Sequence, residues 1–156
     1  MNSRFTLAVH LTGMIAWIDR EQSRSATSAE LAASAGAHDV FVRGILGDLS
    51  RANIVRSQRG RNGGTTLARP AVDITLADVY RAVGEHEKSL LGDYPGGGEK
   101  SCIAGRVIET YLSSVYRSAE AVLMEDLTNR TIDEMSRHVA GELQKRTVQS
   151  QTHSTQ

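Results

Sequence analysis

Arginines gather in one part of the chain, between Arg43 and Arg69, where six of them are opposed by a single acid, Asp48. Guanidinium groups bind phosphate oxygens through paired N–H donors, so a run of this kind indicates a surface for a polyanion. The whole chain is neutral, but residues 1–70 hold nine Arg against five acids, whereas residues 71–156 hold nine Lys or Arg against thirteen acids. The first half is therefore the one that we expect to face phosphate.

Other residue patterns that support chemistry are absent from the sequence. The string GGGEKS resembles the end of a phosphate-binding loop, but Tyr94 and Glu99 stand where that loop needs glycine. The five histidines show no paired metal-ligand spacing, and no Ser or Cys lies in a recognisable nucleophile motif. We therefore expect no catalytic residues and no enzyme activity.

Hydrophobic periodicity predicts a helix-turn-helix in front of the arginines. A first core helix has its apolar residues on one face over 7–18, and Thr27 with Glu30 forms a capping box that begins a short second helix. Gly36 ends this helix, and a third begins at residue 38 or 39. Its buried stripe, at 3.6-residue spacing, comprises Val42, Ile45, Leu46 and Leu49. Two short helices joined by a Gly-containing turn are the sequence form of a helix-turn-helix.

The spacing of the apolar residues changes from a helical to a strand-like pattern directly after the third helix. A strand opens at 54–55, and a second strand returns over 65–68. Between them Asn62 and Gly63 tolerate positive φ, which makes this dipeptide a strong hairpin signal. We therefore expect a winged helix-turn-helix over residues 1–83, in which the hairpin is the wing.

The C-terminal part is expected to hold a linker and two further helices. Residues 84–101 are interpreted as a linker or sensor loop, residues 102–146 as a long helix to about Leu127 and a final helix, and residues 147–156 as a disordered tail. The predicted fold class is thus mainly α with a small β-hairpin wing and a long C-terminal dimerisation helix. Apolar residues recur in that helix at alternating steps of four and three, the pattern of a seam for a partner helix: Ile108, Leu112, Val115, Ala119 and Val122.

The outward face of the third helix is the surface that a recognition helix offers to the major groove. There Arg43 is expected to bind guanine through two hydrogen bonds. Gly44 and Gly47 weaken the helix by roughly 1 kcal/mol each relative to Ala. These glycines are either a local flaw offset by packing or the result of a need for close approach, and the sequence leaves both readings open. Phe41 fits a contact to a base and a partly buried packing position equally well.

The wing tip carries two further cations, Arg59 and Arg61, which are expected to reach phosphate or a minor groove. Hydroxyls and amides at the start of the second helix offer a docking point for a phosphate. The predicted DNA-binding set comprises Thr27, Ser28, His38, Val40, Phe41, Arg43, Gly44, Arg59, Arg61, Asn62 and Gly63.

Four strings carry a resemblance to a known family: SRFTLAVHLTGMIA, SAELAASAG, VRGILGDLSRANIVRSQRGRNGGTTLARP and ITLADVYRAV. On these strings the chain resembles, over nearly its whole length, the Rrf-two (Rrf2) family of bacterial winged helix-turn-helix regulators, which includes the IscR, NsrR and CymR types. The resemblance implies a homodimer that binds a double-stranded DNA operator. We expect a transcriptional repressor acting on a palindromic operator in the cytoplasm.

Many members of that family hold an iron–sulfur cluster with three cysteines in the region corresponding to Asp93–Arg106, where this chain has only Cys102. Cluster ligation needs about four ligands, so we expect no cofactor. The stretch SCIAGRVI resembles the cluster-free branch of the family. Cys102 is then either a redox-sensing thiol at a helix N-terminus or an unreactive cysteine packed near the dimer interface.

One alternative to a DNA-binding protein is a winged helix that contacts only other proteins, because fold does not dictate function. The arginine bias argues against it. A membrane partner is not expected, since the apolar run over 7–18 is well short of the roughly 20 residues that a span requires. Nothing in the sequence argues against a small-molecule effector between the linker and the long helix.

Overall fold

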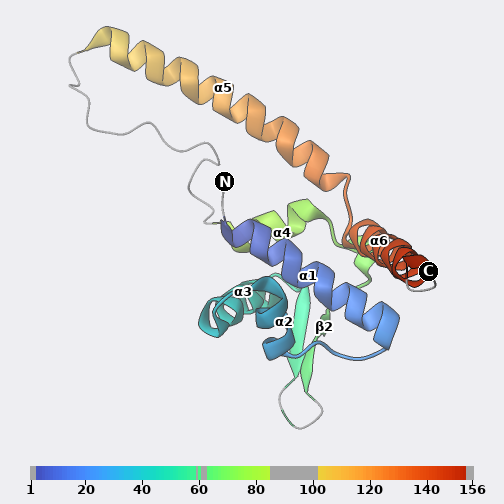
Figure 1. Cartoon of the computed structure of the whole chain (residues 1–156). Coiled ribbons are helices and arrows are strands. Elements are labelled where there is room, and N and C mark those ends of the chain that lie inside the picture. The colour runs from blue at the N-terminus through green and yellow to red at the C-terminus, as the bar shows by residue number, and fades with distance from the viewer. Residues whose placement is uncertain (1–2, 59, 61–62, 85–101, 154–156) are drawn as a thin grey trace.

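The computed structural model describes residues 3–58, 60, 63–84 and 102–153. Helices dominate this part of the chain, and the strands form one antiparallel hairpin, so the predicted fold class is confirmed (Figure 1). The elements in chain order are α1 (Ser3–Gln22), α2 (Ser28–Ala35), α3 (Asp39–Arg51), β1 (Val55–Gln58), β2 (Gly64–Leu67), the 3-10 turn η1 (Ala71–Asp73), α4 (Leu76–Val83), α5 (Ile103–Thr128) and α6 (Ile132–His153).

The helix start predicted at α2 is confirmed. The hydroxyl of Thr27 accepts from the amide of Glu30 at 3.2 Å, and the Glu30 carboxylate accepts from the Thr27 amide at 2.9 Å. Thr75 and Asp78 make the same reciprocal pair at the start of α4, with both bonds at 3.1 Å. Gly36 ends α2 with φ 57°, a left-handed conformation that glycine adopts without steric cost, and the chain turns directly into α3.

The core is built around α1, which packs against α2, α3, α4, β2 and α6. Its buried apolar side chains are Ala8, Leu11, Ile15, Ala16 and Ile18. The predicted stripe of α3 is confirmed, because Val42, Ile45, Leu46 and Leu49 are all buried in the same cluster. None of the helices in the described ranges is long and apolar enough to cross a bilayer.

The hairpin pairs β1 with β2 in antiparallel register, with Ser57 opposite Thr65. A third extended segment joins it just before α2. Ala26 donates to the Thr65 carbonyl at 3.0 Å, and the Thr65 amide donates to the Ala26 carbonyl at 2.8 Å. This segment approaches β2 closely at Gly64. A Cβ atom there would lie 2.4 Å from Oγ of Ser25, so the contact requires glycine. The base of the hairpin is thereby fixed against the start of α2.

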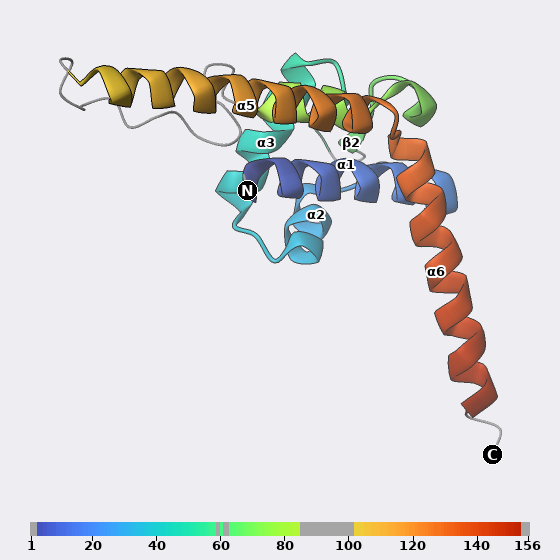
Figure 2. The same ribbon diagram turned by 90° about the horizontal axis from the view of Figure 1, so that it is seen from above.

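Helix α5 begins away from the body and runs back toward it, and the chain then turns sharply into α6 (Figures 1 and 2). Two backbone hydrogen bonds hold this turn to the segment around the start of α4. The Leu76 amide donates to the Arg130 carbonyl and the Ile132 amide donates to the Ile74 carbonyl, both at 2.9 Å. Ile132 is fully buried in the main core. The first turn of α6 therefore belongs to the core of the N-terminal domain, whereas residues 102–146 were expected to form a separate C-terminal region.

The C-terminal helix extends further than expected. Helix α6 runs to His153, although residues 147–156 were expected to be a disordered tail. The sequence from Thr147 to His153 contains neither Gly nor Pro, so no residue type there stops a helix that has already begun.

Candidate nucleic-acid interface

A hollow of about 520 Å³ lies between the start of α2, the outer face of α3 and the base of the hairpin. Four of the predicted DNA-binding residues line it, namely Thr27, Ser28, Arg43 and Gly63. Its other lining residues are Leu46, Gly47, Ser50, Ser57, Gln58, Gly64 and Thr65. The fold thus brings a guanidinium, several hydroxyls and glycine backbone from three elements to one concave surface.

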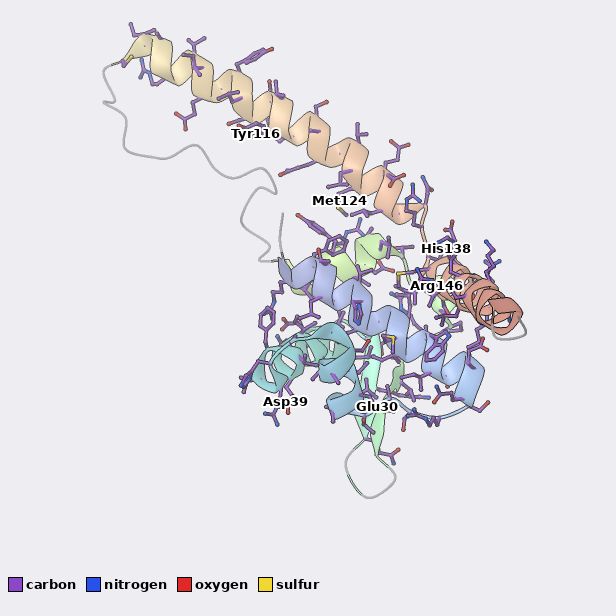
Figure 3. All side chains as sticks on the ribbon, viewed as in Figure 1. Glu30, Asp39, Tyr116, Met124, His138 and Arg146 are labelled. Carbon is purple, nitrogen blue, oxygen red and sulfur yellow. The ribbon has the colours of Figure 1, made fainter. Side chains whose placement is uncertain are left out.

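Hydrogen bonds to a charged carboxylate fix the start of α2 at one side of the hollow. The Thr27 amide and hydroxyl both donate to the Glu30 carboxylate, so Thr27 positions the helix start and the exposed Ser28 follows it toward solvent. Arg24 pairs with Glu30 at 2.6 Å, and this bond, followed by those from Thr27, lowers the pKa of Glu30 from 4.5 to about 2. Glu30 lies on the side of the domain from which the hairpin projects (Figure 3). Because Arg24 neutralises the carboxylate, Glu30 does not repel an incoming phosphate.

The two glycines on the outer face of α3 have no packing role within the described residues. A Cβ atom at Gly44 would meet nothing within 4 Å, and one at Gly47 would meet only the Arg51 guanidinium at 3.8 Å, an ordinary contact. Both positions are helical, so no backbone strain requires glycine there. Packing inside the described chain therefore does not require glycine at these positions, and both readings that the sequence left open stay predictions.

The remaining predicted residues of α3 lie toward its start and do not line the hollow. His38 caps the helix, with Nδ1 accepting from the Val40 amide at 3.4 Å, and Val40 is 64% exposed. Phe41 is 40% exposed and packs under the Arg4 guanidinium, whose carbon lies 5.8 Å from the ring centroid. With the exposed Gly44, these residues continue the outward face of α3 beyond the hollow.

The hairpin contributes polar residues that were not predicted as part of the site. Ser57 and Gln58 line the hollow, and the Ser57 hydroxyl pairs with that of Thr65 across the strands at 2.9 Å. Ser50 also lines it, and its spacing of seven residues from Arg43 places both on one helix face, a pattern that the sequence already contains. Three predicted residues at the wing tip, Arg59, Arg61 and Asn62, lie outside the described residues.

The predicted seam of α5 is largely exposed to solvent. Ile108 is 52% and Val122 66% exposed, and Val115 and Ala119 are exposed as well, while Leu112 is partly buried. Further apolar side chains that were not predicted are exposed on the same helix: Ile103, Val107 and Tyr111. Figure 3 shows side chains standing along α5, where most of the helix is clear of the body. This helix therefore carries more uncovered apolar surface than a solvated helix requires.

A family model described as "Rrf2: Iron-dependent Transcriptional regulator" matches residues 1–138 of the chain. YwnA of Bacillus subtilis (strain 168), whose name places it among HTH-type transcriptional regulators, is 29% identical over 140 residues. That alignment covers 89% of this chain and 98% of YwnA.

Two solved structures have the same fold. The structure of T. potens IscR covers 89% of this chain and 87% of its own, with a TM-score of 0.67 and 19% identity. The structure of CymR, described as the global cysteine regulator of B. subtilis, covers 88% of this chain and 96% of its own, with a TM-score of 0.60 and 16% identity.

The description "iron-dependent" raises the question of an iron site, and the donor set of this chain does not fit a cysteine-ligated one. Iron–sulfur clusters are held by about four ligands, usually thiolates, whereas the chain has one cysteine, Cys102. Among the side chains that the structure describes, no group of three or more His, Cys, Asp or Glu is placed to hold a metal ion. Cys102 instead caps α5, with its Sγ accepting from the Gly105 amide at 3.3 Å.

Proposed function

The chain belongs to the Rrf2 family of transcriptional regulators, and from this premise we propose that it acts as a homodimeric repressor on a palindromic operator. The family consists of DNA-binding regulators rather than enzymes. Each protomer of the dimer inserts one α3 helix into the major groove, and the two half-sites lie about one helical turn apart.

The observation that carries this proposal is the hollow between α2, α3 and the hairpin. Arg43 stands on the outer face of α3, where its guanidinium can bind a guanine edge through two hydrogen bonds. The exposed Ser28 is the first residue of α2, and a helix N-terminus is a favourable place for a phosphate. Arg59 and Arg61 lie outside the described residues, and we expect these two cations of the wing tip to bind the phosphate backbone of the flanking DNA.

The α5 helix supplies the proposed dimer interface. Ile108, Val115 and Val122 are separated by seven residues each, and all three are exposed in the single chain. Apolar residues at this spacing bury their surface only against another helix, and a second copy of α5 offers the same seam. The projection of α5 from the body leaves this seam accessible to a partner (Figure 1).

Cys102 provides a candidate site for a signal. Its side chain is exposed and lies at the first turn of α5, where a helix N-terminus favours negative charge. We propose that oxidation of this thiol alters DNA affinity through the adjoining dimer helix. Binding that responds to peroxide equally in the native protein and in Cys102→Ser would contradict this role.

The experiment that tests the proposed function is selection of bound fragments from the source genome, followed by fluorescence anisotropy on the enriched duplex. A DNA-binding regulator enriches one motif, and its affinity falls with salt at a slope of about −0.9 per neutralised phosphate. Arg43→Ala should weaken binding by about tenfold or more and relax base preference at one position of each half-site. Arg137→Ala, which removes an exposed arginine of α6, is the control and should leave binding unchanged. A flat titration with every duplex would overturn the proposal.

A further inference from the structure

A second cleft borders a different face of α3 from the one that lines the hollow. It has a volume of about 850 Å³ and lies between the N-terminal end of α1, the C-terminal end of α3 and α4, which Figure 1 shows side by side. Whereas Arg43 and Ser50 line the hollow, α3 contributes Asp48 and Arg51 to this cleft. The cleft is thus separate from the proposed DNA-binding surface but shares the reading helix with it.

Two Arg–Asp–Arg sets line this cleft. In the first set, Asp48 is paired with both Arg4 of α1 and Arg51 of α3. One carboxylate therefore serves two guanidinium groups, and this set carries a surplus of one positive charge.

The second set comes from α4 and the segment after the hairpin. Asp78 is paired with Arg69 at 2.9 Å and with Arg81 at 3.7 Å. The same carboxylate also accepts from the Thr75 amide at 3.1 Å, so its oxygens are already engaged by three partners. Arg69 is held further by the carbonyl of Asp73, which leaves Arg81, at the longer distance, as the more loosely held cation of this set. Among the described lining residues, four arginines and two aspartates leave a surplus of two positive charges.

Part of the lining of the cleft is apolar. Ala52 and Ala82 keep accessible surface there, while Ile54 is fully buried and Val83 is 3% exposed. A volume of 850 Å³ lies within the range of small-molecule sites, which combine apolar walls with a few placed polar groups. Guanidinium groups bind carboxylates through two parallel hydrogen bonds, so each set matches one carboxylate.

We propose that this cleft binds a small organic dianion with two carboxylates joined by a short apolar body. One carboxylate is bound by Arg4 and Arg51, the other by Arg69 and Arg81, and the apolar body lies against Ala52 and Ala82. Resting on the proposed function, the ligand is an effector: a carboxylate that competes with Asp48 for Arg4 changes the contact between α3 and α1 and thereby the presentation of Arg43 to DNA.

The test is isothermal titration of the full chain, without DNA, with succinate and adipate as dicarboxylate probes and hexanoate as the monocarboxylate comparison. At least one dicarboxylate should bind saturably, and at least tenfold more tightly than hexanoate. Arg51→Gln and Arg81→Gln should each weaken that binding at least tenfold, while Arg137→Gln on α6 leaves it unchanged. Thermal unfolding of each variant establishes that it is folded before its titration is interpreted.

Several outcomes would overturn the proposal. One is an absence of saturable binding by both dicarboxylates, and another is binding that survives Arg51→Gln with Arg81→Gln. A third is loss of DNA affinity and a flatter salt slope in these two variants with no dicarboxylate binding, which would assign the cleft to the phosphate backbone. Because the titration contains no DNA, its failure is distinguishable from a failure of the proposed DNA binding.

Discussion

Replacing Gly44 with alanine should make the protein more stable and a weaker DNA binder at the same time. In a helix interior, glycine is less favourable than alanine by about 1 kcal/mol. The added methyl meets nothing within 4 Å in the described structure, so no clash offsets this gain. For a chain of 156 residues, about 1 kcal/mol corresponds to a rise in Tm of roughly 2–4 °C.

The opposite effect on DNA binding follows from the position of Gly44 on the outer face of α3. A methyl group there keeps the helix backbone away from the floor of the major groove, which lengthens the hydrogen bonds of Arg43 to a base. We expect a loss of at least tenfold in operator affinity, equivalent to about 1.4 kcal/mol. Thermal unfolding and anisotropy titration of the same preparation measure the two changes.

Gly141→Ala is the matched control, because Gly141 also lies inside a helix, α6, and a Cβ atom there would meet nothing within 4 Å. It should give the same stabilisation with unchanged DNA affinity. The reasoning is refuted if Gly44→Ala stabilises the protein and binds the operator as tightly as before, since close approach is then not the reason for glycine. Destabilisation by Gly44→Ala would show that the added methyl group is not accommodated, contrary to the open space around Gly44.

Three further predictions concern the hairpin, the dimer and acid stability. Gly64→Ala should destabilise the fold and weaken DNA binding, because its methyl displaces Ser25 from the hairpin base; unchanged melting and binding would contradict the close contact. Leu112→Asp should give monomers in sedimentation velocity by placing a charge in the α5 seam, and a variant that remains dimeric would exclude this seam. Because the folded-state pKa of Glu30 is lowered to about 2, its stabilisation is present above pH 4.5 and is lost as pH falls through about 2. Glu30→Gln should flatten the dependence of Tm on pH in this window, and an unchanged acid profile would show that the pair with Arg24 does not contribute.

Features encoded by local pattern could be predicted from the sequence. The capping box of Thr27 with Glu30 and the stripe of α3 are set by residues within a few positions of one another, and both are confirmed. The hairpin followed in the same way from turn residues between two apolar segments.

Features that depend on contacts between distant segments could not be predicted. The burial of Ile132 in the main core requires the chain to return after α5, and nothing in the local sequence around this residue indicates it. The hollow likewise depends on the pairing of Ala26 with Thr65, which no local period encodes. The predicted roles of the DNA-binding residues and of the α5 seam stay predictions until they are measured.

Two backbone hydrogen bonds join Leu76 to Arg130 and Ile132 to Ile74. They form a joint between the N-terminal domain, which carries α3, and the C-terminal end of α5. In a dimer built on α5, the reach from one α3 to the other is set by the direction in which α5 leaves this joint. The spacing between the two operator half-sites is then set by this joint, a part of the protein that contacts no base. Loosening the joint would widen the range of half-site spacings that the regulator accepts while leaving its base preference intact.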